Sequence, residues 1–395
     1  MEKALHDVKI LDLSRVLAGP LGSMLLGDLG ADVIRVEAPG GTDDIRSWWP
    51  FAEEESTYYL CANRNKRSVT INLKEEKGTE IFKKLVRNAD VVVENFKTGT
   101  LDRLGIGYEA LKEIKEDIIL CSVTGYGQTG PYKNHPGYDP VIQAAGGLMD
   151  ITGHPDGEPT RVGTPVVDIM TSHYVAVSIL SALRVRDMQG VGQHIDLSLL
   201  DVQVASLANI ASSFLINGHV SERIGNAHGN ITPYETFQCR DKPIMVAAGN
   251  DRLFTKLCNA LNHPEWSTDD RFKTNPARLE NRSVLTENLD NIFKTDDADR
   301  WANLLAEYGI PCGPVNNIEQ VFEHPQVNAR EMVEEYEHPS LGKVRSVRNP
   351  IRFSESSTAI AKPPPRLGEH TETIFQEELG LSLEEINSLK AEGII

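Results

Sequence analysis

The fold is decided by residues 8–36, VKILDLSRVLAGPLGSMLLGDLGADVIRV. The apolar runs at 8–13 and 32–36 are typical of buried strands, and the residues between them predict a helix. Pro20 in the first turn and Gly30 just after the last turn are usual residues at helix ends. Since a helix joining two parallel strands crosses over with a right-handed turn, this stretch predicts the start of a parallel sheet.

Strand and helix patterns continue to alternate along the chain. Further strands are expected near 91–93, 118–123 and 194–197, and helices near 77–88 and 108–115. This alternation predicts an open α/β sheet with helices on both faces. The first crossover lacks the G-x-G-x-x-G pattern and the chain has no Walker-type loop, so a nicotinamide enzyme and a P-loop enzyme are both disfavoured.

A length of 395 residues suits two domains better than one. A break rich in Gly and Asn follows a helical pattern that ends near residue 215. The expected layout is a large domain at 1–198, a linker at 199–225, a small α+β domain at 226–320, a second linker at 321–340 and the rest of the large domain at 341–395.

Bulk composition limits the classes of partner. The net charge of −17 and the pI near 5.1 argue against nucleic acid or an anionic membrane as the main partner. The sequence shows neither a secretory signal nor an apolar run near 18 residues, so we expect a cytoplasmic protein without a membrane span. Five cysteines without a C-x-x-C pair predict reduced thiols and no metal site, with Cys312 as a packed or loop thiol.

One carboxylate stands out at residues 161–168, RVGTPVVD. Val175, Ile179 and Leu183 are spaced four apart after it and predict a helix that begins near Asp168. Free backbone N–H groups and the helix dipole should hold that carboxylate ionised, as covalent acyl chemistry requires. The alternative is a simple N-cap, which spacing alone would favour.

Several further motifs carry a family resemblance. They are residues 11–20, 27–34, 65–68, 93–96, 101–105, 125–131 and 249–251, with the loop around Cys312. Together they resemble the class III CoA-transferase family, the relatives of formyl-CoA transferase and carnitine CoA-transferase, over nearly the whole chain. The resemblance implies a Rossmann-like large domain built from both chain ends, a smaller domain and an interlocked homodimer. It also implies coenzyme A and acyl-CoA as substrates, with no tightly bound cofactor.

The resemblance assigns Asp168 as the nucleophile. In the family the matching Asp attacks the donor thioester and then carries CoA as an aspartyl-CoA thioester, which divides one difficult exchange into easier steps. Each tetrahedral intermediate needs N–H donors, and Gly146 and Gly147 are candidates for a close backbone approach. These glycines could instead simply end a strand or a turn.

The family's CoA-contact motifs supply the remaining candidates. Arg67 and Arg103 are the first choices for phosphate contact, although a surface salt bridge is the alternative for each. The other expected CoA contacts are Asn95, Phe96, Val16 and Ala18. Lys66 is expected to face solvent.

Two departures from the family pattern narrow the activity. Leu17 stands where formyl-CoA transferases carry Gln, and Tyr138 stands where the α-methylacyl-CoA racemases of the same superfamily carry a catalytic His. Tyr is a poor base near neutral pH, and His135 is out of register, so CoA transfer is favoured over racemisation, which remains the alternative. Tyr138 and Asp139 are candidate substrate-side residues, with a core Tyr and a turn Asp as the alternatives.

The overall pattern is most similar to family members that exchange CoA between succinyl-CoA and small dicarboxylic acids. A second substrate carboxylate would need a cation, and Arg15, Arg46 and His228 are possible. A non-catalytic protein that binds CoA thioesters is a third hypothesis. The presence of Asp168 in the turn before the predicted helix argues against it.

Overall fold

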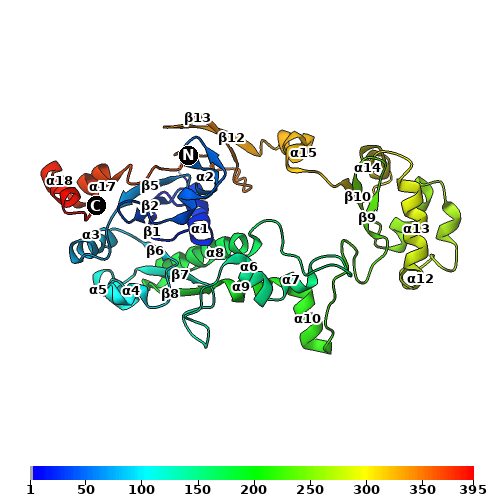
Figure 1. The fold of residues 1–395 in the computed structure, drawn as a ribbon, viewed down its shortest axis with the longest axis horizontal. Helices are drawn as coiled ribbons and strands as arrows, with labels where there is room; N and C mark the ends of the chain where they lie inside the picture. Colours follow the sequence, from blue (N-terminus) through cyan, green and yellow to red (C-terminus); the bar gives the residue numbers. More distant parts are fainter. Residues whose placement is uncertain (1–2) are drawn as a thin grey trace. The chain divides into compact units, whose positions relative to one another are not determined.

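The computed structural model describes residues 3–395, which form two compact units. The larger unit takes the chain up to Leu148, then Arg161–His219 and finally Arg330–Ile395. The smaller unit takes Met149–Thr160 and Val220–Ala329. Both ends of the described chain therefore belong to the larger unit, as the blue and red parts of Figure 1 show.

The chain passes between these units after residues 219 and 329, within the two expected linkers, but the expected large domain is also interrupted at 149–160. Residues 149–160, expected in the large domain, belong to the smaller unit because their backbone is bonded there. The N–H of Gly225 donates to the carbonyl of Gly153 at 2.9 Å, and Arg223 Nη1 donates to the carbonyl of Asp150 at 2.8 Å. The expected linker at 321–340 contains helices and a strand.

The larger unit is built on a six-stranded sheet in which every neighbouring pair is parallel. Its strands are β1 (Lys9–Asp12), β2 (Asp32–Glu37), β5 (Lys66–Thr70), β6 (Val91–Glu94), β7 (Ile119–Thr124) and β8 (His194–Ser198). The order β5-β2-β1-β6-β7-β8 means that the sheet grows first to one side of β1 and then to the other. The expected open, parallel α/β sheet is confirmed. Of the six strands of this sheet, only the edge strand β5 was not predicted from the sequence.

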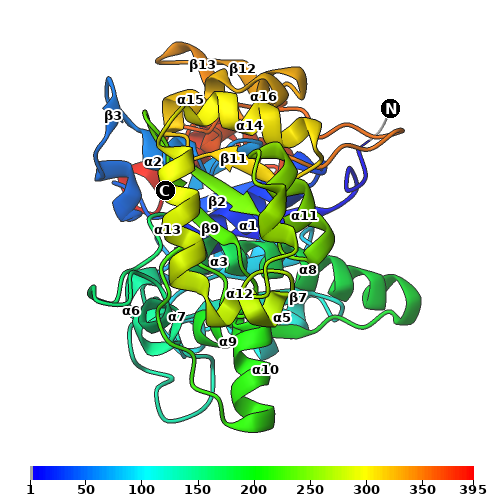
Figure 2. The same cartoon turned by 90° about the vertical axis from the view of Figure 1, so that its right-hand side faces the viewer.

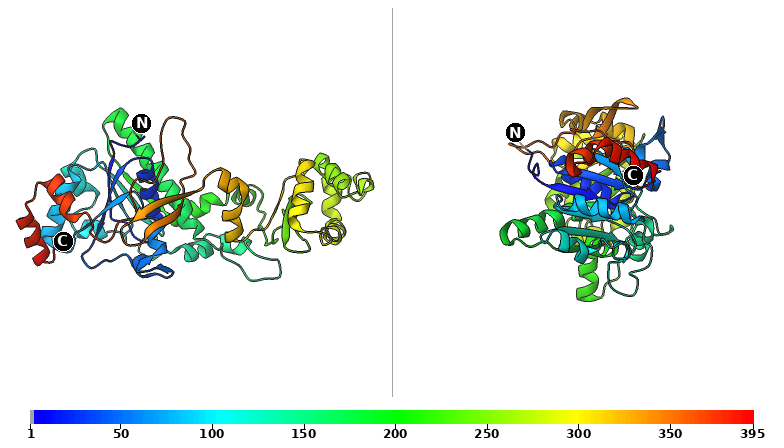
Figure 3. Two further views of the ribbon diagram at one scale, coloured as in Figure 1. Left: turned by 90° about the horizontal axis from the view of Figure 1, so that it is seen from above. Right: turned by 90° about the vertical axis from the view of Figure 1, so that its left-hand side faces the viewer.

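Both faces of this sheet are buried, which explains the continuous apolar runs of its strands. Successive side chains alternate between the faces, so Ile10 packs in one core and Leu11 in the other. The first face is covered by α1 (Ala18–Asp28), α8 (Val166–Gln189) and α9 (Leu199–Ser206). The second face is covered by α3 (Glu76–Val86), α5 (Tyr108–Ile114), α17 (Thr371–Leu379) and α18 (Leu383–Ala391). Figure 3 shows the red C-terminal helices close to α3.

Helix α8 carries Asp168 and lies on the side of the sheet that ends in β7 and β8. It packs along α1 and against β7 and β8. By length and composition it could also cross a membrane, which the sequence-based expectation did not foresee, yet 44% of its most apolar window is buried inside the structure. Helix α9 continues into α10 (Ala208–Asn217) with a bend of 76°.

The smaller unit has a three-stranded antiparallel sheet with helices around it (Figure 2). Its strands are β9 (Tyr234–Gln238), β10 (Pro243–Ala247) and β11 (Cys312–Pro314), and its main helices are α11 (Asp251–Ala260), α13 (Arg282–Phe293) and α14 (Ala298–Glu307). Phe237, Phe254 and Leu289 are buried in its core. Cys312 is a half-buried thiol whose Sγ contacts the carbonyl of Ala302, as expected of a packed thiol.

Shorter elements complete the chain. They are η1 (Asp44–Ser47), β3 (Phe51–Ala52), β4 (Glu55–Ser56), α2 (Thr57–Leu60), α4 (Thr100–Arg103), α6 (Asp139–Ala145), α7 (Leu148–Ile151), η2 (Pro264–Ser267), α12 (Asn275–Glu280), α15 (Ile318–Glu323), α16 (Pro325–Ala329), β12 (Val333–His338) and β13 (Gly342–Val347). Strands β12 and β13 pair as an antiparallel hairpin in the larger unit.

Candidate active site

A cavity of about 330 Å³ lies where the strand order of the larger unit reverses, between β1 and β6. In open parallel sheets ligands bind at this point, outside the carboxyl ends of the strands, because the loops on either side diverge there. Residues 15–18 line the cavity after β1, residues 95–98 after β6, and residues 123–125 and 133–138 at and after the end of β7. Asp168, from the first turn of α8, lies in the same wall.

A second cavity of about 570 Å³ adjoins the first one. It follows the carboxyl ends of β1, β2, β5 and β6, and Lys74 and Leu104 lie in its wall. Arg15 and Phe96 line both cavities. The guanidinium of Arg15 lies over the Phe96 ring, 5.1 Å from its centroid. The two cavities together offer an extended binding surface along one edge of the sheet.

The β1–α1 loop forms one side of both cavities in a strained conformation. Val16 has a φ of 65°, a left-handed conformation that costs a β-branched residue about 1–3 kcal/mol. Its N–H donates to Asp43 Oδ1 at 3.0 Å. The preceding residue, Arg15, donates its N–H to Asn95 Oδ1 and accepts a bond from Asn95 Nδ2, each at 2.8 Å.

The first turn of α8 is capped by Asp139 of α6. Asp139 Oδ2 accepts the N–H of Val167 at 2.8 Å and that of Asp168 at 3.3 Å. Asp139 Oδ1 accepts a bond from Gln143 Nε2 at 2.6 Å, so the capping side chain is itself fixed. Asp168 therefore is not the N-cap that spacing alone favours. Asp139, proposed from the sequence as a substrate-side residue, is buried outside the cavity wall and positions the helix.

The pKa of Asp168 is raised to about 7, first by burial and then by the negative charge of Asp139. The expectation that the helix start would hold this carboxylate ionised therefore fails below about pH 7. The physical reason is that Asp139 takes the N–H groups of Val167 and Asp168, while the Asp168 side chain has no hydrogen bond to another described residue. Loss of water around the carboxylate then outweighs the helix dipole.

Six of the residues predicted to bind substrate or CoA lie in the cavity wall. They are Val16, Leu17, Ala18, Asn95, Phe96 and Tyr138. The Asn95 side chain also bonds the N–H and the carbonyl of Arg15, and so holds the loop. Tyr138 is 57% exposed, which excludes the alternative of a core tyrosine.

The two arginines chosen for phosphate contact are outside the wall of either cavity. Arg67 pairs with Asp32 at 2.5 Å, at the start of β2 and away from the carboxyl ends, which fits the salt bridge given as its alternative. Arg103 is exposed on α4 and donates to Thr100 Oγ1 at 2.9 Å. Lys66, expected in solvent, is fully buried and pairs with Asp12 at 2.9 Å.

The two glycines predicted to approach the reacting carbonyl also lie outside the cavity wall. A Cβ on Gly146 would lie 2.3 Å from Cγ of Gln203, so this glycine permits close packing of α6 on α9. Gly147 follows it with a φ of 82° and ends the helical segment. The alternative given for both glycines, the end of a structural element, fits these positions.

Sequence reasoning missed or underrated several residues of the wall. Lys97 and Lys133 were not considered, and Arg15 was named only for a second carboxylate. His135, set aside as a loop residue, also lines the cavity and stacks on Tyr132 with ring centroids 4.7 Å apart. The position of Arg15 and Lys97 just after β1 and β6 was a usable signal, because carboxyl ends of parallel strands meet at one edge.

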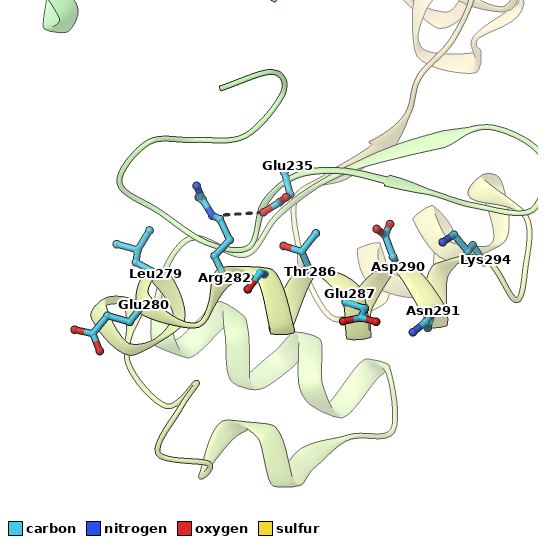
Figure 4. A pocket seen from close by; sticks show the side chains of 10 residues that line it. Glu235, Leu279, Glu280, Arg282, Thr286, Glu287, Asp290, Asn291 and Lys294 are labelled. Atoms are coloured by element: carbon cyan, nitrogen blue, oxygen red, sulfur yellow. Dashed lines mark ion pairs between the residues drawn. The ribbon is translucent and has the colours of Figure 1, made fainter. Parts of the chain in front are cut away.

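The smaller unit has a recess of its own, of about 810 Å³, along α13 (Figure 4). Its wall holds four carboxylates and two cations: Glu235, Glu280, Glu287, Asp290, Arg282 and Lys294. Arg282 is turned toward Glu235, with 3.8 Å between the charged atoms. A surface with this excess of negative charge is poorly suited to a polyanion such as coenzyme A, so the cavity of the larger unit is the better candidate.

Comparisons with known proteins identify the family. The model of CoA-transferase family III matches residues 5–371. The human succinyl-CoA:glutarate CoA-transferase is 44% identical over all of this chain and 90% of its own length. The succinate–glutarate CoA-transferase of Agrobacterium fabrum is 41% identical, over 94% of this chain and 95% of its own. A crystal structure of a CAIB/BAIF family protein from Brucella suis has a TM-score of 0.87 and 43% identity, covering 96% of this chain and 100% of that one. The chain therefore belongs to CoA-transferase family III and is a CoA-transferase.

Proposed function

We propose that Asp168 is the covalent nucleophile of CoA transfer and that the cavity between β1 and β6 is the active site. The observation that carries the proposal is the position of the Asp168 carboxylate in a wall that also presents Arg15, Lys97 and Lys133. The net charge of the whole chain is −17, so these cations give the cavity a local character opposite to that of the protein. An anionic thioester can approach such a site.

The reaction begins when a carboxylate oxygen of Asp168 attacks the carbonyl carbon of the donor thioester. The C–S bond breaks, the CoA thiolate leaves and a mixed anhydride forms. The thiolate then attacks the Asp168 carbonyl carbon, which releases the donor acid and leaves an aspartyl-CoA thioester. The acceptor carboxylate repeats these steps in reverse, so no proton or electron is gained or lost overall.

The two adjoining cavities suggest how coenzyme A lies. Its phosphates need cations, and Lys74 in the second cavity can supply one. The pantetheine arm is largely apolar and would pass the ring of Phe96, which lines both cavities. The thioester then reaches Asp168 at the far end of the first cavity.

We propose dicarboxylic acids as substrates, with succinyl-CoA as the donor. The names of the human and Agrobacterium relatives support this choice. Among the cations considered for the second carboxylate, Arg46 is occupied by Glu37 through two bonds of 2.9 and 2.7 Å. His228 belongs to the smaller unit. Arg15 is half-buried, lines the cavity and has no carboxylate partner among the described residues, and its planar fork suits a carboxylate.

A second candidate function rests on His135. Its imidazole lies in the same wall as Asp168, so it could move a proton at the α-carbon of an acyl-CoA, as in the racemases of the superfamily. Solvent deuterium entering the α-carbon without any second carboxylic acid would favour this function over CoA transfer.

Replacing Asp168 by Asn should reduce CoA transfer by about 10³-fold or more, because the amide cannot act as the nucleophile. Wild-type enzyme incubated with succinyl-CoA, treated with hydroxylamine and digested should carry the trapped adduct on the peptide with Asp168. Asp44→Asn, which removes another carboxylate of the same wall, is the matched control and should retain the adduct at Asp168. An active Asp168→Asn enzyme, or an adduct on another residue, would refute the assignment.

The pH dependence of kcat/KM should report the raised pKa of Asp168. Only the ionised carboxylate attacks, so the rate should fall as the pH drops below about 7. Asp139→Asn removes the negative charge that raises this pKa and should move the midpoint to lower pH. Asp44→Asn should leave the midpoint in place, because Asp44 does not contribute to the shift. An unchanged midpoint of the kcat/KM profile in Asp139→Asn would contradict this electrostatic account.

Arg15→Gln should separate dicarboxylic from monocarboxylic substrates. Loss of a bond to a charged group predicts a fall of about 10- to 100-fold in kcat/KM for succinyl-CoA with glutarate. Acetyl-CoA with propionate should lose less than about threefold, since neither acid has a second carboxylate. Lys133→Gln, an exposed cation of the same wall, is the control and should affect both pairs alike. Equal losses for Arg15→Gln would place Arg15 on the CoA phosphates instead.

We also propose that the chain acts as a homodimer in which the two subunits interlock, as the resemblance to the class III CoA-transferase family implies. Helix α10 has no buried residue, and its Phe214, Leu215 and Ile216 are 55%, 80% and 85% exposed. An exposed apolar run of this kind is usually covered by a partner. Light scattering of the purified protein should give twice the mass of 43.7 kDa, and a monomer mass would contradict the proposal.

A further inference from the structure

The β1–α1 loop adopts its strained conformation only with help from other parts of the chain. Val16 has a φ of 65°, which a β-branched residue rarely adopts without strong local constraints. Arg15, Leu17 and Ala18 beside it all line the cavity of Asp168. A relaxed Val16 would change the direction of the backbone at this point and would turn these side chains away from their present positions.

Two side chains from outside the loop hold this backbone. Asn95, just after β6, bonds both the N–H and the carbonyl of Arg15 at 2.8 Å. Asp43 bonds the N–H of Val16 at 3.0 Å through Oδ1. The bonds that Asn95 and Asp43 make to Arg15 and Val16 therefore go only to backbone groups. These bonds do not depend on which side chains the loop carries.

Asp43 is fixed in turn by a buried cluster of charges. Its Oδ2 pairs with Arg35, which is fully buried and also pairs with Glu37 at 3.2 Å. Lys66 and Asp12 continue the cluster at 2.9 Å, and Lys66 Nζ donates to the carbonyl of Pro20 at 2.8 Å in α1. The cluster thus reaches both the strained loop and the first turn of the helix that follows it.

We propose that Asp43 and Asn95 are positioning residues of the transfer reaction. They hold Arg15 and Val16 in the strained conformation that keeps the loop side chains in the wall of the cavity with Asp168. The inference rests on the proposal that this cavity is the active site. It goes beyond that proposal because neither residue is required to touch the substrate.

A mutant cycle with Val16→Gly tests this inference, because glycine adopts a positive φ without strain. Asp43→Ala removes the bond to the Val16 N–H. We expect it to lower kcat by at least tenfold in the Val16 enzyme and by less than threefold in the Val16→Gly enzyme, with KM changing less than kcat in both. An equal loss of kcat in the two backgrounds would overturn the inference.

Glu37→Gln is the matched control for the cycle. It removes another carboxylate of Arg35 but receives no bond from the loop, so any loss it causes should be the same in both backgrounds. The loss of kcat caused by Glu37→Gln could instead differ between the two backgrounds as much as the loss caused by Asp43→Ala. That result would assign the effect to the charge cluster and overturn the role of Asp43.

Hydrogen exchange of the wild-type enzyme gives a measurement that does not depend on the folding of any variant. The amides of Arg15 and Val16 should exchange slowly because Asn95 and Asp43 accept their bonds. Exchange at the rate of an unprotected amide would overturn the inference. Failure of the active-site proposal would be distinguishable, since it would appear as full activity of Asp168→Asn.

Discussion

The reversal of strand order between β1 and β6 is the constraint on which the site depends. All six strands run parallel, so every strand delivers its following loop to the same edge of the sheet. Loops that leave β1 and β6 diverge, because the sheet grows in opposite directions from these two strands. The loop with Arg15 and the segment with Asn95 are therefore close enough to bond each other while a cavity opens beside them. Helix α8 adds Asp168 to this edge because it packs along α1, the first helix after β1.

The raised pKa of Asp168 follows from the hydrogen bonds at the start of α8, which go to Asp139. A helix offers only a few free N–H groups, and Asp139 takes those of Val167 and Asp168. Asp168 is then left without hydrogen bonds to described residues and in poor contact with water, so its pKa rises to about 7. A carboxylate of higher pKa is a better nucleophile, and it stands closer to a thiol, whose ordinary pKa is about 8.5. In the proposed mechanism, exchange of an acyl group between this carboxylate and the CoA thiolate is thereby brought nearer to balance.

Sequence reasoning identified the sheet and singled out Asp168, which the structure places in the cavity wall, but it could not give side-chain directions. The strands were found because both faces of the sheet are buried, which makes their sequences continuously apolar. β5 was missed since its sequence, KRSVT, begins with two cations. The first of these cations, Lys66, was expected in solvent and is buried. Neighbouring residues of a strand point to opposite faces, so Lys66 enters the buried cluster while Arg67 pairs with Asp32. A family motif names both residues and says nothing about which one faces a ligand.

Buried charge is the other feature that sequence patterns hide, and it bears on how the site stays open. Asp12, Glu37 and Asp43 face Arg35 and Lys66 in the interior, where unpaired charges would be costly. An apolar cluster could fill the same space, but it would offer no acceptor to the N–H of Val16. The buried charges thus matter because they fix the position of Asp43, rather than because they add to the net stability. They fix a backbone group at a chosen point, and the strained loop that results keeps its side chains in the wall of a cavity that close packing would otherwise fill.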